Sequence, residues 1–354
     1  MNLPLMPPVA PMLAKAVEAI PRGAYDYEPK WDGFRAIVFR DGDQVEIGSR
    51  NARSLTRYFP EVVSAIVSGL PERCVLDGEL VVPEPLRGRL DFEALQQRIH
   101  PAESRVRLLS QRTPAHYVAF DLLAIGERDV TGEPFGDRRR LLAEVLLGVG
   151  SPLHITPSTR DPEVAEQWFD EFEGAGLDGI VAKPLGETYQ QGKRVMFKIK
   201  HVRTADCVVA GYREFKGSER AVGSLLLGLY DDSGVLVSVG VVGAFPLERR
   251  RELFGELQPL VTALEGHPWS FAAGEGTVRT PRSSEFSRWS VGKDLSFVPL
   301  RPELVVEVRY DHMEGNRFRH TAQFVRWRPD RDPRSCTFDQ LEAPVRFDLA
   351  DVLG

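Results

Sequence analysis

The stretch Glu28-Pro-Lys-Trp-Asp-Gly-Phe-Arg35 is the part of the sequence on which the fold prediction rests. It places Lys30 between a bulky apolar residue and the turn-forming pair Asp32-Gly33, and a second cation follows at Arg35. A lysine amine becomes a nucleophile when burial or neighbouring cations lower its pKa. A glycine lets a bulky ligand approach the backbone closely. The stretch therefore indicates either a reactive lysine beside a bound ligand or a surface lysine on a β-turn.

Around this stretch, residues 1–204 alternate strand and helix patterns. Ala36–Phe39 and Val45–Ile47 flank Asp41-Gly42, which is a hairpin signature. Apolar runs predict further strands at Cys74–Val82, His116–Leu123, Ile180–Ala182 and Val195–Ile199, and helical spacing predicts helices at Glu61–Val67, Arg138–Leu147 and Pro162–Phe172. Antiparallel strands with helices outside them indicate an α+β domain.

The rest of the chain, residues 205–354, is richer in strands. The predicted strands are Cys207–Tyr212, Gly223–Tyr230, Val235–Val242, Leu304–Tyr310 and Ala322–Trp327, and a helical insert is expected over Leu247–Leu264. Five short strands with one helix fit a small all-β barrel of the OB type. A chain of 354 residues normally forms two domains, so we predict an α+β domain over 1–204 and a barrel with a C-terminal tail over 205–354.

Composition narrows the class of protein but not its partner. The chain is 42% hydrophobic and 27% charged, as is usual for a soluble protein, and it has neither a membrane-spanning run nor a signal peptide pattern. Its three cysteines are widely separated and give no disulfide or metal-ligand spacing, so cytoplasmic residence is expected. The net charge of −6 neither supports nor excludes nucleic acid, because local patches decide contact.

Seven short motifs, in order along the chain, resemble those of the covalent nucleotidyltransferases: DNA ligases, RNA ligases and mRNA-capping enzymes. In that family the lysine of the first motif forms a phosphoramide with AMP or GMP. The matching segments are Lys30–Arg35, Ser49-Arg50, Leu76–Leu80, Val118–Asp121, Asp178–Lys183, Phe197–Lys200 and Arg328–Arg331. Seven ordered matches across nearly the whole chain are not expected by chance, and they favour the reactive lysine over the surface turn.

The resemblance implies a role for each motif residue. It assigns catalysis to Lys30, Arg35, Lys198 and Lys200, and ATP or AMP binding to these four with Glu28, Arg50, Glu79, Phe120, Lys183, Arg328, Asp330 and Arg331. Glu79 would accept hydrogen bonds from the ribose, and Phe120 would stack on the adenine; otherwise they are an exposed acid and a core aromatic. Because Lys198 and Lys200 alternate with apolar residues, they share a strand face. There they would lower the pKa of Lys30 and neutralise the α-phosphate, unless the face is merely solvated.

A divalent metal, Mg²⁺ or Mn²⁺, is also implied. Asp178, with Glu79, is the expected ligand, since a carboxylate beside a triphosphate holds a metal that neutralises developing charge. The family more often has glutamate at the position of Asp178, and aspartate keeps the charge but has a shorter reach. The alternative is that Asp178 only begins a turn before the next strand.

Two segments sharpen the likeness to actinobacterial DNA ligases of the ligase C type: Leu90–Pro101 and Leu300–Phe324. This implies a DNA-binding barrel face, and the residues expected to bind DNA are Arg35, Arg50, Arg309, Arg317, Arg319 and Arg326. The barrel arginines alternate with aromatic residues, but acids interleave with them, so an arginine-rich solvated sheet is the alternative. Val241 stands where related ligases often have a basic residue, which puts DNA contact from that strand in doubt.

We therefore predict an ATP-dependent DNA ligase that seals nicked or broken double-stranded DNA, in DNA repair, through a lysine–AMP intermediate. The family implies a monomer with a domain hinge, expected near Arg203-Thr204, and leaves recruitment by a Ku-like end-binding protein open. RNA ligation or capping by the same chemistry is the nearest alternative. A non-catalytic DNA-end-binding adaptor is the alternative of another class.

Overall fold

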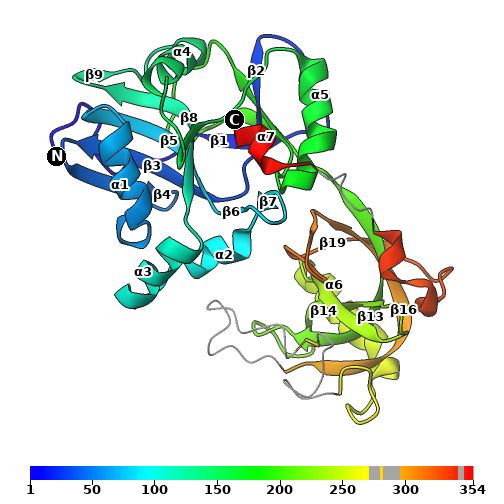
Figure 1. The fold of residues 1–354 in the computed structure, drawn as a ribbon. Helices are drawn as coiled ribbons and strands as arrows, with labels where there is room; N and C mark the ends of the chain where they lie inside the picture. Colours follow the sequence, from blue (N-terminus) through cyan, green and yellow to red (C-terminus); the bar gives the residue numbers. More distant parts are fainter. Residues whose placement is uncertain (271–279, 282–295, 342–346, 354) are drawn as a thin grey trace. The chain divides into compact units, whose positions relative to one another are not determined.

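The computed structural model describes residues 1–270, 280–281, 296–341 and 347–353, and the chain divides into two compact units (Figure 1). Unit 1 comprises Met1–Lys200 and Pro344–Gly354, and unit 2 comprises His201–Ala343. The sequence analysis placed the boundary after residue 204 and the whole C-terminus in the second domain. In the structure the C-terminal residues 347–353 pack within unit 1.

Unit 1 contains two main sheets. The larger has the order β10-β8-β5-β3-β4, with β9 beside β8, and the smaller has the order β1-β12-β11-β2. The strands of the larger sheet are β3 (Phe34–Asp41), β4 (Gln44–Ser49), β5 (Arg73–Val81), β8 (His116–Ile125), β9 (Arg128–Asp129) and β10 (Leu153–Ile155). Those of the smaller sheet are β1 (Leu13–Ala16), β2 (Tyr25–Pro29), β11 (Ile180–Pro184) and β12 (Arg194–Ile199). Most neighbours are antiparallel, as predicted, but β1 with β12 and β8 with β10 are parallel.

The predicted hairpin is present between β3 and β4. The two strands pair from Ala36 opposite Ser49 to Asp41 opposite Gln44, and Gly42 at the turn has φ of 61°, a conformation that favours glycine. A small second hairpin, β6 (Pro83–Glu84) with β7 (Arg89–Leu90), follows β5. Local turn chemistry therefore decided this part of the fold.

Three helices of unit 1 lie close to their predicted ranges: α1 (Pro60–Gly69), α4 (Phe135–Val145) and α5 (Pro162–Glu171). The start of α5 follows the expected chemistry, because Asp161 accepts a hydrogen bond from Glu163 N and a proline comes next. Three helices were not predicted: α2 (Phe92–Gln97), α3 (Glu103–Arg112) and α7 (Leu349–Leu353). Short 3₁₀ turns, η1 (Thr56–Tyr58) and η2 (Phe172–Ala175), complete the unit, and Figure 1 shows α4 against strand β8.

Unit 2 is a five-stranded antiparallel barrel with strand order β15-β14-β13-β16-β19. Its strands are β13 (Arg203–Glu214), β14 (Val222–Tyr230), β15 (Leu236–Val242), β16 (Val298–Tyr310) and β19 (Gln323–Trp327). A bridge between Val242 and Ala322 joins the two edges, so the sheet closes as an OB-type barrel does. A small hairpin, β17 (Met313–Glu314) with β18 (Arg317–Phe318), and the turns η5 (Pro333–Ser335) and η6 (Phe338–Gln340) lie in its C-terminal half. The predicted helical insert is shorter than expected: α6 (Leu247–Leu257) is followed by the turn η3 (Gln258–Leu260).

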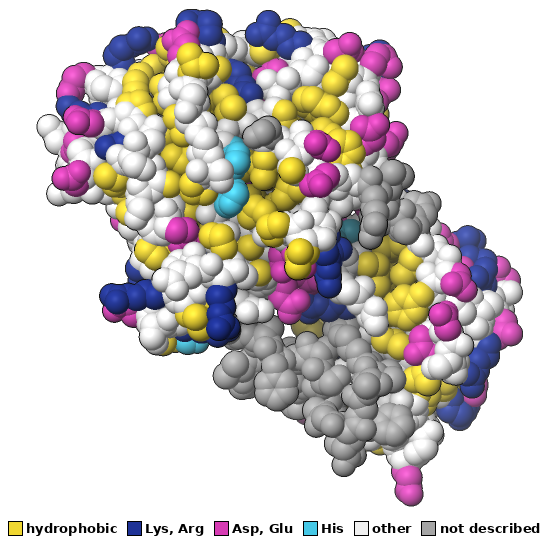
Figure 2. Space-filling view, in the orientation of Figure 1, with side chains coloured by type: hydrophobic (Ala, Val, Ile, Leu, Met, Phe, Trp, Pro, Cys, Tyr) yellow, Lys and Arg dark blue, Asp and Glu magenta, His cyan; other side chains and the backbone are white. Residues whose placement is uncertain are grey.

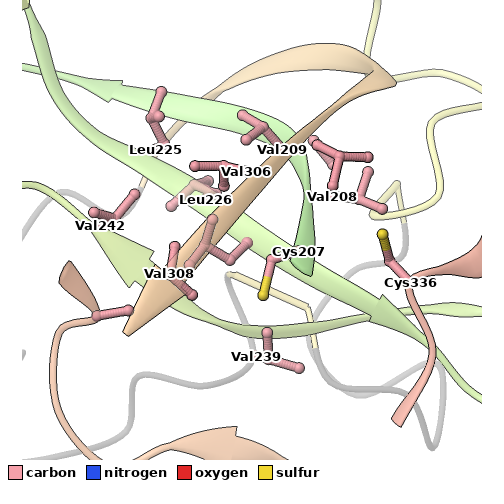
Figure 3. Packing of buried hydrophobic residues seen from close by; sticks show 14 of the residues in the cluster. Cys207, Val208, Val209, Leu225, Leu226, Val239, Val242, Val306, Val308 and Cys336 are labelled. Carbon is pink, nitrogen blue, oxygen red and sulfur yellow. The ribbon is translucent and has the colours of Figure 1, made fainter. Parts of the chain in front are cut away.

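The barrel encloses a core of β-branched and leucine side chains (Figure 3). Cys207 and Cys336 lie in this core, and both are free thiols, as is the buried Cys74 of unit 1. Burial raises the pKa of Cys336 to about 11, so this thiol is protonated and unreactive at neutral pH. These cysteines therefore serve packing, in line with the absence of a disulfide or metal-ligand pattern in the sequence.

The surface is mixed in charge, as the small net charge suggests. Figure 2 shows basic and acidic side chains interspersed over the described residues that are visible there. Among the described helices, none is both long and apolar enough to cross a membrane.

Candidate active site

The backbone holds the segment of Lys30 against that of Asp178. Lys30 follows the last residue of β2, its N–H donates to Gly179 O at 2.8 Å, and its carbonyl accepts from Asp178 N at 2.9 Å. Gly179 has φ of 108°, and a Cβ there would lie 2.0 Å from the carbonyl oxygen of Ile199. Only glycine therefore allows β11 and β12 to come this close beside Lys30.

The side chains of these two segments form one ionic cluster. Lys30 Nζ and Lys200 Nζ each lie 2.7 Å from Oδ2 of Asp178. Burial by itself would raise the pKa of Asp178, but the charges of the two lysines outweigh it and lower this pKa to about 2. Asp178 is therefore a carboxylate at any working pH, and it orients the amine of Lys30.

The indole of Trp31 fixes the other side of the lysine segment. Its side chain is buried, and Nε1 donates to Oγ1 of Thr156 at 2.8 Å. Trp31 thus anchors the segment in the protein and leaves the neighbouring Lys30 partly exposed.

A cavity of about 220 Å³ adjoins this cluster. Its charged lining residues are six cations, Lys30, Arg35, Arg50, Lys183, Arg194 and Lys198, and two acids, Glu28 and Glu79. Phe120, Met12 and Met196 are among its apolar lining residues. An excess of cations in a concave site attracts a polyanion such as a triphosphate, and the apolar side chains can cover a flat ring.

Arg35 is fixed by a buried acid that the sequence analysis did not single out. Its Nε and Nη2 donate to the two carboxylate oxygens of Asp77, each at 2.6 Å. Tyr189 donates its hydroxyl to Asp77 as well, at 2.6 Å. Burial disfavours the charged form of Arg35, but the Asp77 carboxylate outweighs this and raises the pKa of Arg35 above its ordinary value. Arg35 is thus a fixed positive charge at the cavity wall.

Phe120 lines the cavity but is only 6% exposed. Cations lie over its ring: Arg35 Cζ is 4.3 Å and Lys183 Nζ is 4.5 Å from the ring centroid. The predicted stacking of adenine on Phe120 would therefore place the base on a ring that Arg35 and Lys183 also contact.

Glu28 and Lys183 form a buried ion pair, with Oε2 and Nζ 2.7 Å apart. Lys183 also donates to the carbonyl oxygen of Phe120 at 3.0 Å. The second oxygen of Glu28, Oε1, is buried and has no hydrogen-bond partner among the residues that the structure describes. Burial raises the pKa of Glu28, and the Lys183 charge offsets part of this. An unsatisfied buried acceptor in the cavity wall is costly, so it indicates a ligand that donates a hydrogen bond there.

Glu79 lies opposite Arg35 in the β3–β5 pairing. Burial raises the pKa of Glu79 to about 7, although the neighbouring charges of Arg35 and Lys30 oppose the shift. The expected ribose acceptor is therefore close to half protonated at neutral pH.

Of the two lysines predicted to share a strand face, Lys198 lies on β12 and lines the cavity, whereas Lys200 follows the end of β12 and pairs with Asp178. Burial lowers the pKa of Lys198, and the charges of Lys200 and Lys30 lower it further. The same alternation, followed backwards along β12, places Arg194 and Met196 in the cavity wall too. Both were missed in the sequence, although the period of two could have found them. Asp77 lies within the motif segment Leu76–Leu80 but was given no role, and no sequence signal marks Tyr189; only the fold brings both residues to Arg35.

The described residues of this site can hold a divalent metal only if a bound phosphate supplies further ligands. Among the described residues there is no group of three or more His, Cys, Asp or Glu side chains that could hold an ion. Asp178 has two ammonium groups on one oxygen, so it offers a metal at most a single ligand. Mg²⁺ commonly binds through one or two carboxylates with phosphate and water oxygens, and Asp178 and Glu79 remain the predicted ligands.

In unit 2 the predicted DNA-binding arginines differ in their surroundings. Arg309 is exposed on β16, whereas Arg326 pairs with Glu307 at 2.6 Å and Arg317 pairs with Glu314. Burial lowers the pKa of Arg319 to about 10, which leaves it charged at neutral pH. All four are retained as predicted DNA contacts, and Arg309 and Arg326 are the two exposed ones.

Comparisons with known proteins agree with this geometry. Family models match two regions: an "ATP dependent DNA ligase domain" over residues 10–200 and an "ATP dependent DNA ligase C terminal region" over residues 218–331. The chain is 65% identical to DNA ligase C of Mycobacterium tuberculosis, with 100% of this chain and 99% of that protein covered. It is 30% identical to the multifunctional non-homologous end joining protein LigD of Pseudomonas aeruginosa, over 95% of this chain and 37% of that protein. A solved Lig E DNA ligase shares the fold, with a TM-score of 0.55, 17% identity, and coverage of 90% of this chain and 100% of that one.

Proposed function

The chain belongs to the ATP-dependent DNA ligase family, and from this premise we propose that Lys30 is the residue that takes AMP from ATP. Two features support the assignment. Asp178 forms ion pairs with both Lys30 and Lys200, and the adjoining cavity is lined by six cations. A surface lysine on a turn would have neither. ATP is the nucleotide of the family, which also uses a divalent metal.

In the first step, the ammonium of Lys30 gives a proton to solvent, and the lone pair of Nζ then forms a bond to the α-phosphorus of ATP. The bond from that phosphorus to pyrophosphate breaks, and AMP stays on the lysine. Asp178 is a weak base, because its pKa is about 2, so its task is to orient Lys30. Lys198 and Arg35 stabilise the charge that develops on the phosphoryl oxygens.

The metal, which we propose is Mg²⁺ or Mn²⁺, would supply charge neutralisation at the phosphates. Asp178 is its proposed protein ligand, with Glu79 nearby to accept from the ribose. Because a metal at Asp178 competes with two ammonium groups, its arrival would loosen the hold on Lys30.

Glu28 gives the site its preference for adenine. Its unpaired Oε1 can accept a hydrogen bond from the exocyclic amino group of adenine. Guanine presents a carbonyl oxygen at that position, which would leave two acceptors facing each other without water. ATP is therefore favoured over GTP, and this opposes the capping alternative.

DNA ligases act on nicked DNA, and two further steps complete the reaction. AMP moves from Lys30 to the 5′-phosphate of the nick, and the 3′-hydroxyl then attacks that phosphate and releases AMP. We propose that Arg35 and Arg50 contact the 5′-phosphate, and that Arg309, Arg317, Arg319 and Arg326 contact the DNA backbone. The proposed role is repair of nicks or breaks, including end joining, by a monomer that a Ku-like protein could recruit.

The hinge between the units is best placed at His201-Val202. Arg203 and Thr204, where the sequence analysis expected it, belong to β13 and pair with Tyr310 and Arg309 of β16. Ladder hydrogen bonds hold such residues in place. Val202 lies before the strand, and its side chain is exposed, so a change of backbone dihedrals there disturbs no ladder.

The test is the intact mass of the purified protein after incubation with ATP and Mg²⁺ or Mn²⁺. Wild type should gain one AMP, and Lys30→Ala should gain none. The control variant Lys193→Ala removes an exposed lysine that immediately precedes β12, and it should gain AMP normally. A wild type without adduct under either metal, or an adduct on Lys30→Ala, contradicts the proposal.

Substrate assays separate the remaining alternatives. Sealing of nicked DNA but not nicked RNA excludes an RNA ligase, and an AMP adduct without a GMP adduct excludes a capping enzyme. A protein that binds DNA ends but forms no adduct would be the adaptor.

A further inference from the structure

Asp206, a carboxylate on the first barrel strand β13, holds both arginines of the last motif, Arg328–Arg331. Arg328 Nη1 donates to the two oxygens of Asp206, at 3.1 and 2.9 Å, and Arg331 Nε lies 3.7 Å from Asp206 Oδ2. The Asp206 side chain is only 10% exposed. Its backbone is fixed too, because Gln340 accepts from Asp206 N at 2.7 Å and donates to Asp206 O at 3.0 Å.

The guanidinium of Arg328 is bound along both edges. In addition to the contact with Asp206, its Nε and Nη2 donate to Asp330 at 3.0 and 2.9 Å, and its side chain is 18% exposed. A planar guanidinium has five donors, and these contacts engage all three of its nitrogens. Arg328 thus links Asp206 of β13 to Asp330 of its own motif, and these contacts hold its guanidinium in place.

Arg331 is the better placed of the two arginines for an anion. Its side chain is 35% exposed, compared with 18% for Arg328, although its Nε atom is buried, lies 3.7 Å from Asp206 Oδ2 and makes no hydrogen bond among the described residues. Arg331 Nη2 donates to the carbonyl oxygen of Ser335 at a long 3.3 Å. The sequence analysis gave both arginines the same role, and the structure distinguishes them.

We propose that Asp206 is a positioning residue for the adenylation step. It holds the guanidinium of Arg328 in place and so orients Arg331 to bind the pyrophosphate that leaves ATP. The inference rests on the proposed function and on the ATP-binding role that the resemblance implies for the motif Arg328–Arg331. No bond is made or broken at Asp206. The bond to phosphorus forms at Lys30, and Arg331 stabilises the negative charge that gathers on the leaving group.

The test compares two partial reactions of Asp206→Asn, which keeps the size of the side chain and the backbone contacts to Gln340. Formation of enzyme–AMP from ATP should slow about tenfold, as expected for loss of one charged hydrogen bond. Sealing of a nick whose 5′-phosphate already carries AMP should stay within about twofold of wild type, since no pyrophosphate leaves in that reaction. Asp206→Glu restores the charge and should recover part of the adenylation rate.

The matched control is Glu303→Gln, an exposed acid on β16 that pairs only with Arg301 in the described part of the chain. It should leave both reactions unchanged. Equal slowing of both reactions by Asp206→Asn, or unchanged adenylation, overturns the proposal. If Asp206→Asn does not fold, Arg331→Gln decides the matter, because it should slow adenylation alone, and normal adenylation in this variant overturns the proposal as well. Failure of the proposed function looks different, since wild type itself would then form no AMP adduct.

Discussion

At the scale of single residues, the site depends on acids whose pKa values are shifted in opposite directions. Asp178 has a pKa lowered to about 2 because two lysines outweigh its burial. Glu79 has a pKa raised to about 7 because burial outweighs its cationic neighbours. Two carboxylates near one lysine thus differ in role: the first stays ionised and orients Lys30, and the second titrates in the working range.

The raised pKa of Glu79 has a consequence for stability. The folded protein retains a proton on Glu79 up to a pH of about 7, whereas the unfolded chain loses it near 4.5. The folded state therefore binds more protons between these values, and ionisation of Glu79 lowers the free energy of unfolding as the pH rises from about 4.5 to 7. In wild type this loss amounts to about 2 kcal/mol between pH 5 and pH 8. In Glu79→Gln it should be absent.

Urea unfolding of wild type and Glu79→Gln at both pH values measures the difference. The exposed Glu18→Gln is the control, and its pH dependence should match that of wild type. Parallel pH dependence in wild type and Glu79→Gln would show that Glu79 ionises without opposing the fold.

At the scale of elements, the smaller sheet of unit 1 aligns the groups that we propose to be catalytic. Lys30 follows β2, Asp178 precedes β11, and Lys198 lies on β12, and these three strands are neighbours. A backbone contact between Lys30 and Gly179 fixes their register. The sheet therefore brings together groups that lie about 150 residues apart in the sequence.

Gly179→Ala tests how far this alignment depends on one glycine. The φ of 108° and the contact of 2.0 Å to Ile199 O forbid a Cβ without backbone movement. We expect a loss of more than about 2 kcal/mol in the free energy of unfolding and a strong decrease in the AMP adduct. Gly186→Ala, where a Cβ meets nothing within 4 Å, should stay within about 0.5 kcal/mol of wild type. Denaturant unfolding and intact mass measure both effects, and equal values for the two variants would contradict the prediction.

At the scale of the whole molecule, the chain leaves unit 1 at Lys200 and returns to it at the C-terminus. Leu349 and Val352 of α7 pack in a cluster that includes Trp31 and Phe172, and Leu349 N donates to Gly88 O at 2.8 Å. Unit 2 is therefore attached to unit 1 at both ends. The tail also packs in the same cluster as Trp31, the residue next to Lys30.

Leu349→Ala should destabilise unit 1 by about 2–4 kcal/mol, because it opens a cavity in this buried cluster. Asp351→Ala changes an exposed residue of the same helix and should alter stability by less than about 0.5 kcal/mol. Calorimetry measures both. An effect of Leu349→Ala as small as that of Asp351→Ala would show that α7 adds little to unit 1.

Much of the fold was predictable because its signals are local. The Asp41-Gly42 turn, the alternating barrel strands and the proline after Asp161 each act within a few residues. Helices α2, α3 and α7 were missed because they are short or strongly polar, and packing rather than local pattern stabilises them. The parallel pairing of β1 with β12 was missed for the same reason: no local signal selects a partner about 180 residues away.

The sequence by itself indicated the family, which the comparisons confirm, and it predicted the reactive lysine and the two-domain order, because ordered motifs and hydrophobic periods are properties of the chain. Only the tertiary structure decided which charges meet. It paired Lys30 and Lys200 on Asp178, held Arg35 on Asp77, and gave Arg328 and Arg331 different surroundings around Asp206. The physical reason is that burial and distance set the strength of a charge interaction, and neither can be determined from the order of residues.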